Sequence, residues 1–413
     1  MKFFLSLFVS ANLLFSILSV PMSAMSAGSD LPTKNTIQAE PTQQEENAQS
    51  TETAALNISA PSALLMETST GTVIYEKNCH ESLRPASVTK IMTLLLIFDA
   101  LSSGQISLDD TVTVSEHAAS MGGSQVYLEP GETQTVETMI KCISVASAND
   151  ACVAMSELIA GSETEFVNRM NERARGLNMT DTNFVNCCGL EAEGHLTSAN
   201  DVALMSRELL TKYPDIHEYC TIWMENITHT TAKGTSEFGL TNTNKLIRQY
   251  QYATGLKTGY TSLAKYCVSA SAKKDGMELI AVIMAAPDAK SRTADAIALL
   301  NYGFGTCRIY SDPNTEPLAP LALKKGVLSQ APLAYQGPFQ YVSINGTDLS
   351  GVSKSIELPE NADAPIQKGS VAGKAVYSLN GKEIGSVNIL YTEDIAAATY
   401  KDYFCKTLQF FLP

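Results

Sequence analysis

A serine and a lysine three positions apart, Ser87 and Lys90, could form an activated nucleophile. On a helix, three residues advance the chain by about 4.5 Å and bring the side chain back to nearly the same face, so the hydroxyl and the amine would be neighbours. An amine that is screened from water loses its proton more readily and can then take one from a serine. Pro85 and the apolar run at positions 91–98 predict that this pair opens a buried helix.

The same spacing occurs twice more, at Ser262 with Lys265 and at Ser271 with Lys274. The first of these pairs lies in a polar stretch that predicts a loop. The second is expected at the end of an exposed strand, before a Lys-Asp-Gly turn. Neither pair is followed by a long apolar helix, so the sequence favours Ser87 as the candidate nucleophile.

A second triplet, Ser147-Ala148-Asn149, follows at the end of a predicted apolar helix. Its hydroxyl can pass a proton to a leaving amine, and its carboxamide can hydrogen-bond a peptide backbone. A similar triplet begins at Ser198, but Asp201 and an apolar periodic run come after it. We interpret that copy as a helix N-cap.

A third triplet, Lys257-Thr258-Gly259, occurs once and lies in a predicted strand. On a strand, Lys257 and Gly259 share one face and Thr258 points to the other. The lysine would add a cation near Ser147, and the threonine hydroxyl can bind a carboxylate. The glycine would leave room for a substrate to lie along the strand edge.

These three motifs, in this order, resemble those of the D-alanyl-D-alanine carboxypeptidases among the low-molecular-mass penicillin-binding proteins. The resemblance runs from about Ala63 to the C-terminus. Besides the motifs, it includes four short segments and the strand pair after Lys257. The segments are Leu64-Leu65-Met66-Glu67, Met121-Gly122-Gly123-Ser124-Gln125, Asn242-Thr243-Asn244-Lys245-Leu246 and Asn301-Tyr302-Gly303-Phe304.

The resemblance implies an exported serine-type carboxypeptidase that removes the terminal D-alanine from peptidoglycan stem pentapeptides through an acyl-enzyme. β-Lactam antibiotics would be covalent inhibitors, and neither a cofactor nor a metal is expected. By analogy with the family, the catalytic residues are the nucleophile, its general base and the proton relay, namely Ser87, Lys90 and Ser147. The substrate-binding residues are Asn149, Lys257, Thr258, Gly259 and Tyr260, with the backbone N–H groups of Ser87 and Tyr260 forming the oxyanion hole.

Three positions depart from the pattern of the family it resembles. Lys265 stands where relatives usually have a glycine beside the site strand. Thr243 occupies a place where some relatives carry a carboxylate-binding arginine. Cys187 and Cys188 replace a more usual Pro-His type pair. These departures bear on substrate detail rather than on the reaction.

Two other functions deserve comparison with the carboxypeptidase. A serine β-lactamase shares the nucleophile, but it should also carry a deacylating glutamate in a Glu-x-x-Leu-Asn pattern between Asn149 and Lys257. No such pattern is present, and the nearest acidic candidate, Glu193, has Glu-Gly-His surroundings. A catalytically inactive wall-binding scaffold is the second alternative, and the intact motifs argue against it.

Other catalytic classes find little support. The sequence has no Gly-x-Ser-x-Gly elbow and no His-Glu-x-x-His motif, and its five histidines are dispersed. His195 is predicted to be a hydrogen-bonded structural residue. A net charge of −14 makes nucleic acid an unsuitable partner.

Nine cysteines are scattered along the chain, an odd number without any Cys-x-x-Cys pair. Most have apolar neighbours, which is typical of small buried side chains. The pattern supports neither a disulfide framework nor a zinc site of the usual spacing.

The fold expected between residues 60 and 312 is α+β, a β-lactamase/transpeptidase-like catalytic domain in which an antiparallel sheet joins both ends of the segment around a helical subdomain. Residues 316–391 have short alternating strands, and the Asn380-Gly381 pair predicts a hairpin. We therefore expect a separate small all-β domain there.

Both ends of the chain carry signals of their own. Lys2, an apolar run and a small-residue stretch predict a signal peptide over residues 1–27, with cleavage between Ala24 and Ala27. Residues 28–59 are polar and predict a disordered linker. Residues 394–413 predict an amphipathic helix that lies on the membrane surface, with docking on its own domain as the alternative.

Overall fold

The computed structural model describes residues 56–411, without the side chains of residues 406 and 409–411. The predicted signal peptide and almost all of the predicted linker lie outside the described residues.

A five-stranded antiparallel sheet in the order β2-β1-β9-β8-β7 is the centre of the larger part of the chain. Its strands come from both ends of the segment, as predicted, because β1 pairs with β9 along its whole length. The strands are β1 (Ser62–Glu67), β2 (Val73–Lys77), β7 (Ala253–Thr261), β8 (Lys265–Lys274) and β9 (Met277–Ala286). This pairing leaves β7 as an edge strand, with one side free of sheet partners.

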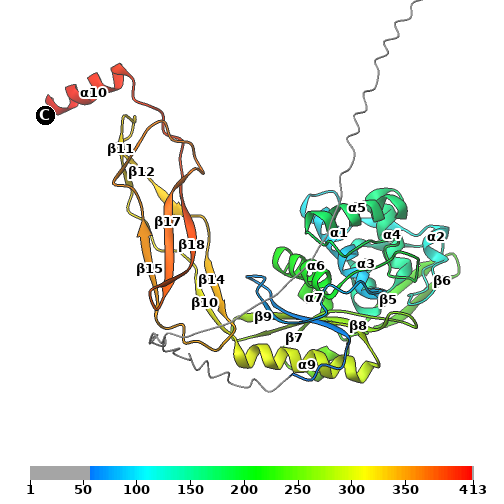
Figure 1. Cartoon of the computed structure of the whole chain (residues 1–413). Helices are drawn as coiled ribbons and strands as arrows, with labels where there is room; N and C mark the ends of the chain where they lie inside the picture. The colour runs from blue at the N-terminus through cyan, green and yellow to red at the C-terminus, as the bar shows by residue number, and fades with distance from the viewer. Residues whose placement is uncertain (1–55, 412–413) are drawn as a thin grey trace, which may run out of the picture. The chain divides into compact units, whose positions relative to one another are not determined.

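Helices cover both faces of this sheet (Figure 1). On one face lies α9 (Ala289–Thr306), whose buried Leu299 and Leu300 join a core with β8 and β9. The larger core lies on the other face, where α1 (Lys90–Ser102) is buried on nearly all sides, as its apolar sequence predicts. The remaining helices there are α2 (Glu116–Ala119), α3 (Val136–Lys141), α4 (Asn149–Ala160), α5 (Glu163–Gly176), α6 (Ala199–Lys212) and α7 (Ile216–Cys220). The short helix α8 (Leu246–Gln249) instead contributes Leu246 to the core with α9.

Two short helical turns and two small hairpins complete this part. The turns are a 3₁₀ turn, η1 (Ala86–Thr89), and a π turn, η2 (Cys142–Ala146). The hairpins pair β3 (Thr111–Thr113) with β4 (Thr133–Thr135) and β5 (Met224–Thr231) with β6 (Gly234–Thr241). These turns contain Ser87 and precede Ser147, so regular α-helix is interrupted at two of the sequence motifs.

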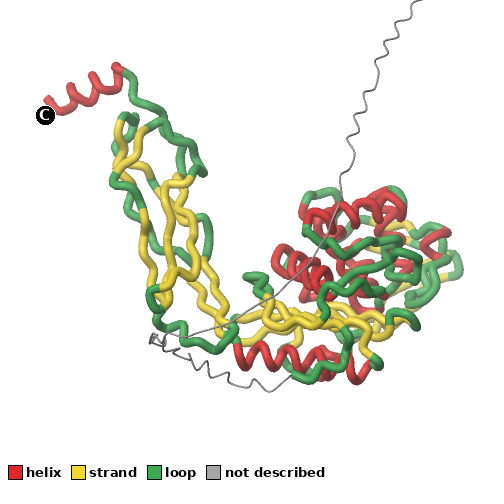
Figure 2. The backbone as a smooth tube through the Cα atoms, in the orientation of Figure 1, coloured by secondary structure: helices red, strands yellow, loops and turns green. Residues whose placement is uncertain are grey.

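The C-terminal part is built mostly from strands (Figure 2). Its own core includes Phe339, Tyr377 and Ile389. The predicted hairpin is present, because β17 and β18 are joined by Asn380 and Gly381, both with positive φ. The strands are β10 (Arg308–Asp312), β11 (Leu321–Lys324), β12 (Gln330–Ala331), β13 (Leu333–Tyr335), β14 (Phe339–Ser343), β15 (Val352–Glu357), β16 (Asn361–Asp363), β17 (Val371–Leu379) and β18 (Lys382–Tyr391).

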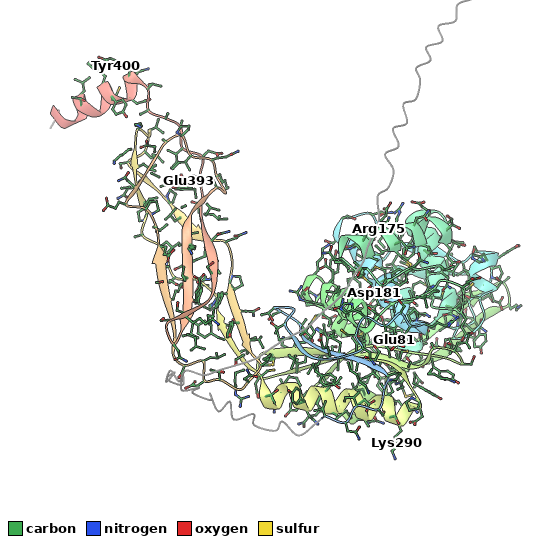
Figure 3. The ribbon with its side chains drawn as sticks, in the orientation of Figure 1. Glu81, Arg175, Asp181, Lys290, Glu393 and Tyr400 are labelled. Atoms are coloured by element: carbon green, nitrogen blue, oxygen red, sulfur yellow. The ribbon has the colours of Figure 1, made fainter. Side chains whose placement is uncertain are left out.

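The last helix, α10 (Tyr400–Phe411), starts later than the predicted residue 394. Thr399 and Asp402 account for the start, because each donates a backbone N–H to the other's side-chain oxygen, which is a reciprocal cap. Tyr400, labelled in Figure 3, is 90% exposed. Within residues 56–411, the helices are all too short or too polar to cross a bilayer.

Candidate active site

Ser87 lies in the 3₁₀ turn η1 rather than in the first α turn, and Lys90 is the first residue of α1. The turn is compact because Ala86 has a φ of +47° and its carbonyl packs directly on Gly189. A Cβ at Gly189 would lie only 1.8 Å from the Ala86 oxygen. The predicted neighbours are nevertheless in place, since Lys90 Nζ donates to Ser87 Oγ over 3.1 Å.

Three acceptors surround the buried amine of Lys90. Besides Ser87 Oγ, it donates to Asn149 Oδ1 over 2.6 Å and to the backbone oxygen of Cys188 over 2.7 Å. A neutral amine has only two N–H donors and one lone pair. The amide oxygen of Asn149 and the backbone oxygen of Cys188 can only accept hydrogen bonds, so they would keep the two N–H donors of a neutral Lys90. The lone pair of the amine would then face the Ser87 hydroxyl. This geometry suits a general base.

The second motif sits where a helix breaks. After α3 the chain widens into the π turn η2, and Ser147 then adopts a left-handed conformation with a φ of +62°. A residue other than glycine adopts this conformation only when the surrounding structure holds it there. Such backbone strain is common at functional sites. Asn149 begins α4 and donates from Nδ2 to the Gly122 oxygen over 2.7 Å, which orients its amide oxygen toward Lys90.

Lys257 is fully buried on the edge strand β7 and donates to Ser147 Oγ over 2.9 Å and to its neighbour's backbone oxygen, that of Thr258, over 3.2 Å. Burial, together with the nearby charge of Lys90, lowers the pKa of Lys257 to about 7. A lysine with a labile proton therefore lies behind the Ser147 hydroxyl.

A pocket of about 260 Å³ opens in front of these groups. It is lined by Ser87, Ser124, Ser147, Thr243, Thr258, Gly259, Tyr260 and Arg292. Lys90, Asn149 and Lys257 are not among the lining residues and lie behind them. Lys90 and Lys257 contact the hydroxyls of Ser87 and Ser147, and Asn149 contacts Lys90. The structure thus brings all three sequence motifs to one place.

Gly259 lines the pocket and also has a packing role that the sequence did not predict. A Cβ at this position would lie 2.9 Å from the Pro85 oxygen and 3.0 Å from the Ser87 nitrogen. The missing side chain therefore makes room for the backbone of the nucleophile turn, which packs directly on β7. The close approach also brings the Ser87 N–H and the strand edge to the same side of the pocket.

Two lining residues were not singled out in the sequence as site residues. Arg292 lies in the first turn of α9, where its guanidinium stacks 5.8 Å from the ring centre of Tyr266 and donates to the Cys267 oxygen over 3.4 Å. Ser124 accepts the N–H of Asn149 with its backbone oxygen over 2.7 Å. Neither residue belongs to a recognisable catalytic motif in the sequence. They were found only because the fold brings α9 and the loop that contains Ser124 to the pocket.

The three departures from the family pattern have clear places. Lys265 has a φ of +56°, a conformation that glycine adopts without strain. Thr243 accepts a hydrogen bond of 3.1 Å from Thr258 Oγ1 at the pocket. Cys187 and Cys188 are buried, and the carbonyl of Cys188 is the acceptor for Lys90.

Other candidates have structural roles. His195 is hydrogen-bonded through Nε2 to Thr89 Oγ1 over 2.9 Å, and its Nδ1 accepts the Val185 N–H over 3.0 Å. Burial lowers the pKa of His195 to about 4. Ser198 caps α6 by accepting the Asp201 N–H, as predicted.

The expected exposure of Ser271 is wrong, because it is buried on β8. A strand also turns residues three apart to opposite faces, which separates Ser271 from Lys274.

Comparison with known proteins agrees with this geometry. Residues 47–288 match the family model described as D-alanyl-D-alanine carboxypeptidase, and residues 313–397 match that of the penicillin-binding protein 5 C-terminal domain. The chain is 43% identical to the D-alanyl-D-alanine carboxypeptidase DacF of Bacillus subtilis, covering 86% of this chain and 91% of that one. It is 32% identical to DacC of Escherichia coli, covering 83% and 85%.

Solved structures show the same relationship. Penicillin-binding protein 5 from Haemophilus influenzae aligns with a TM-score of 0.69 at 29% identity, over 82% of this chain and 98% of that one. The ampicillin-bound penicillin-binding protein D2 from Listeria monocytogenes aligns with a TM-score of 0.53 at 29% identity, over 60% of this chain and 99% of that one. The predicted α+β class with a small β domain is confirmed. The chain belongs to the D-alanyl-D-alanine carboxypeptidase family.

Proposed function

We propose that this chain removes the terminal D-alanine from peptidoglycan stem pentapeptides through an acyl-enzyme on Ser87. The observation that carries the proposal is the position of Lys90 Nζ, 3.1 Å from Ser87 Oγ and held by two further acceptors. The family membership supports the reaction, and the geometry supports the assignment of residues.

In the acylation step, Ser87 Oγ attacks the carbonyl carbon of the penultimate D-alanine and its proton moves to Lys90. The oxyanion that forms would be bound by the backbone N–H groups of Ser87 and Tyr260. Ser147 then gives its proton to the leaving amine, and Lys257, 2.9 Å away, can replace it. After Lys90 has released its proton to solvent and Lys257 has regained one, Lys90 takes a proton from a water molecule, whose oxygen attacks the ester carbonyl. The ester bond then breaks, the shortened peptide leaves and the proton on Lys90 returns to Ser87 Oγ.

The leaving D-alanine carries a carboxylate, and the pocket offers groups that could hold it. The hydroxyls of Thr258 and Thr243 are hydrogen-bonded to each other, and Arg292 lines the same pocket. A β-lactam presents a similar carboxylate beside its reactive amide. We therefore propose that penicillins acylate Ser87 as covalent inhibitors, in keeping with the ampicillin-bound Listeria relative.

We also propose that the protein acts outside the cytoplasm, after export directed by residues 1–27, and that α10 lies on the membrane surface. The support for α10 is its exposed aromatic and aliphatic side chains, Tyr400, Tyr403, Phe404 and Leu408. No observation favours the β-lactamase alternative.

The test is D-alanine release from a synthetic peptide that ends in D-Ala-D-Ala, measured beside covalent labelling by a fluorescent penicillin. Ser87→Ala should abolish both signals. Ser262→Ala, which removes the serine of another Ser-x-x-Lys pair, should leave both intact. Release that persists in folded Ser87→Ala would refute the assignment. Rapid turnover of a chromogenic β-lactam without D-alanine release would favour a β-lactamase.

A further inference from the structure

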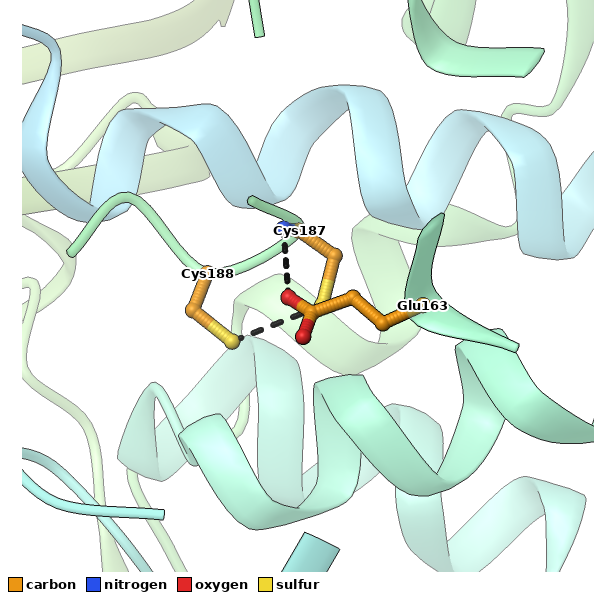
Figure 4. A group of neighbouring side chains, drawn as sticks. All are labelled: Glu163, Cys187 and Cys188. Carbon is orange, nitrogen blue, oxygen red and sulfur yellow. Dashed lines mark hydrogen bonds between the residues drawn. The ribbon is translucent and has the colours of Figure 1, made fainter. Parts of the chain in front are cut away.

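Two adjacent cysteines and a glutamate form a cluster that the proposed reaction does not use. Cys187 and Cys188 lie between α5 and α6, and Glu163 is the first residue of α5 (Figure 4). One ligand atom from each of the three lies within 4.8 Å of the others. Among residues 56–411, this is the only group of three or more histidine, cysteine or carboxylate side chains so arranged.

The spacing of the two sulfurs suits a metal ion. Cys187 Sγ and Cys188 Sγ are 3.5 Å apart. In a tetrahedral zinc site with Zn–S bonds of about 2.3 Å, two sulfurs lie about 3.8 Å apart, so only a small adjustment is needed. Thiolates also select thiophilic ions over magnesium or calcium.

The glutamate is oriented toward the sulfurs by contacts on both of its oxygens. Glu163 Oε1 accepts the Cys187 N–H over 3.1 Å, and Oε2 lies 3.1 Å from Nε2 of His117. Figure 4 shows the carboxylate pointing to the cysteine pair. His117 is exposed and Glu163 partly so, whereas both cysteines are buried, so an ion can enter from the histidine side. The imidazole lies outside this group of three, and a movement toward the sulfurs would let it supply a fourth ligand.

The backbone of the cysteine pair is already fixed by the nucleophile helix α1. Thr93 Oγ1 donates to the Cys187 oxygen over 2.6 Å, and Lys90 Nζ donates to the Cys188 oxygen over 2.7 Å. The backbone that carries both thiols is thereby held in position without an ion. A divalent cation would also offset two of the three negative charges of two thiolates and a carboxylate.

We propose that Glu163, Cys187 and Cys188, completed by His117, form a binding site for a thiophilic divalent cation of the zinc class. The absence of Cys-x-x-Cys pairs does not argue against it, because the ligands come from adjacent residues and from a distant helix start. One of its ligands, Cys188, also supplies the carbonyl that accepts a hydrogen bond from Lys90, and the site goes beyond the carboxypeptidase reaction.

The experiment titrates the reduced full-length protein with Cd²⁺ and follows the ultraviolet thiolate-to-cadmium charge-transfer band. The exposed thiol of Cys405 is first removed by Cys405→Ser, so that only internal sites report. Zn²⁺ affinity is then measured by competition with a chromogenic chelator. Circular dichroism and thermal unfolding establish that each variant is folded.

In the Cys405→Ser background, the protein should bind one Cd²⁺ with a thiolate band. Cys187→Ser and Cys188→Ser should each weaken the band and the Zn²⁺ affinity. Glu163→Gln keeps both thiols and an acceptor for the Cys187 N–H, and we expect it to reduce Zn²⁺ affinity at least about tenfold. Cys79→Ser is the matched control, because Cys79 is buried with Glu76 Oε2 3.8 Å from its sulfur.

The proposal is overturned if the Cys405→Ser protein shows no thiolate band, or if Glu163→Gln and Cys188→Ser both bind Zn²⁺ as tightly as that protein does. A loss of the band in Cys79→Ser that equals the loss in Cys187→Ser would also overturn it, because binding would then not be specific to this cluster.

Discussion

Lys257 Nζ donates a hydrogen bond of 2.9 Å to Ser147 Oγ, and both residues are buried. The lysine reaches the serine from the edge strand β7, whereas the serine is held in a left-handed conformation between η2 and α4. This contact joins the sheet to the helical part at the catalytic motifs. It also places an ionisable amine where protonation affects both stability and proton transfer.

The depressed pKa of Lys257 predicts a pH-dependent stability. Its pKa is about 7 in the folded protein and about 10.4 when unfolded, so between these values the unfolded chain binds one more proton. Stability should therefore rise with pH through this window, and the cost of burying the charge is fully present below pH 7. Above about pH 8.5, ionisation of unfolded-state thiols opposes the trend.

The measurement is the thermal midpoint from the fluorescence of the single tryptophan, Trp223, between pH 6 and 8.5. The wild-type midpoint should rise with pH more steeply than that of Lys257→Met. Lys265→Met, which removes an exposed lysine, should follow the wild-type slope. Equal slopes for wild type and Lys257→Met would contradict the prediction.

Removal of the Lys90 amine should slow acylation of Ser87. We expect Lys90→Met to react with a fluorescent penicillin about 10²–10⁴-fold more slowly, because the general base is lost. Stopped-flow labelling measures the rate. Lys274→Met, from another Ser-x-x-Lys pair, should label at the normal rate, and a normal rate in Lys90→Met would exclude the lysine as the base.

Gly189 should be intolerant of a side chain. Gly189→Ala places a Cβ 1.8 Å from the Ala86 oxygen at a φ of +84°, and we expect it to destabilise the fold by more than about 3 kcal/mol. Gly104 has a φ of +73° but open space around it, so Gly104→Ala should lose only about 1 kcal/mol. Denaturant unfolding followed by Trp223 fluorescence measures the free energy of unfolding of the two variants. Equal losses of this free energy would mean that the backbone moves away from the Ala86 oxygen at no cost.

Arg292 should favour substrates that carry a free C-terminal carboxylate. If its guanidinium forms a charge-assisted contact worth about 1.5–3 kcal/mol, Arg292→Gln should lower kcat/KM for a D-Ala-D-Ala peptide about 10–100-fold. The same peptide with an amidated C-terminus should lose little further activity in the variant. Lys290→Gln, which removes a neighbouring exposed cation, serves as the control. An equal loss on both peptides would indicate a structural role for Arg292.

The helix α10 should bind membranes through its exposed side chains. Tyr400→Ser combined with Phe404→Ser removes two side chains that are 90% and 60% exposed, and we expect a marked loss of co-sedimentation with phosphatidylglycerol vesicles. Val371→Ser, at a 58% exposed position on β17, is the control for a general loss of apolar surface. Unchanged sedimentation of the double variant would refute the membrane role.

The sequence by itself determined the chemical groups and their local arrangement. The i, i+3 spacing of Ser87 and Lys90, the N-cap at Ser198 and the Asn380-Gly381 hairpin all depend on interactions between residues a few positions apart. Such interactions depend mainly on the local residue types and backbone periodicity, and these can be read without knowing what lies elsewhere in the fold.

Only the tertiary structure decided which distant groups meet these residues. The Cys188 carbonyl reaches Lys90 because a loop packs on η1, and Arg292 reaches the pocket because α9 packs on the sheet. The left-handed conformation of Ser147 and the contact of Gly259 with the nucleophile turn have the same origin. Each depends on packing between segments far apart in the chain, which overrides local preference and leaves no pattern in the sequence around either partner.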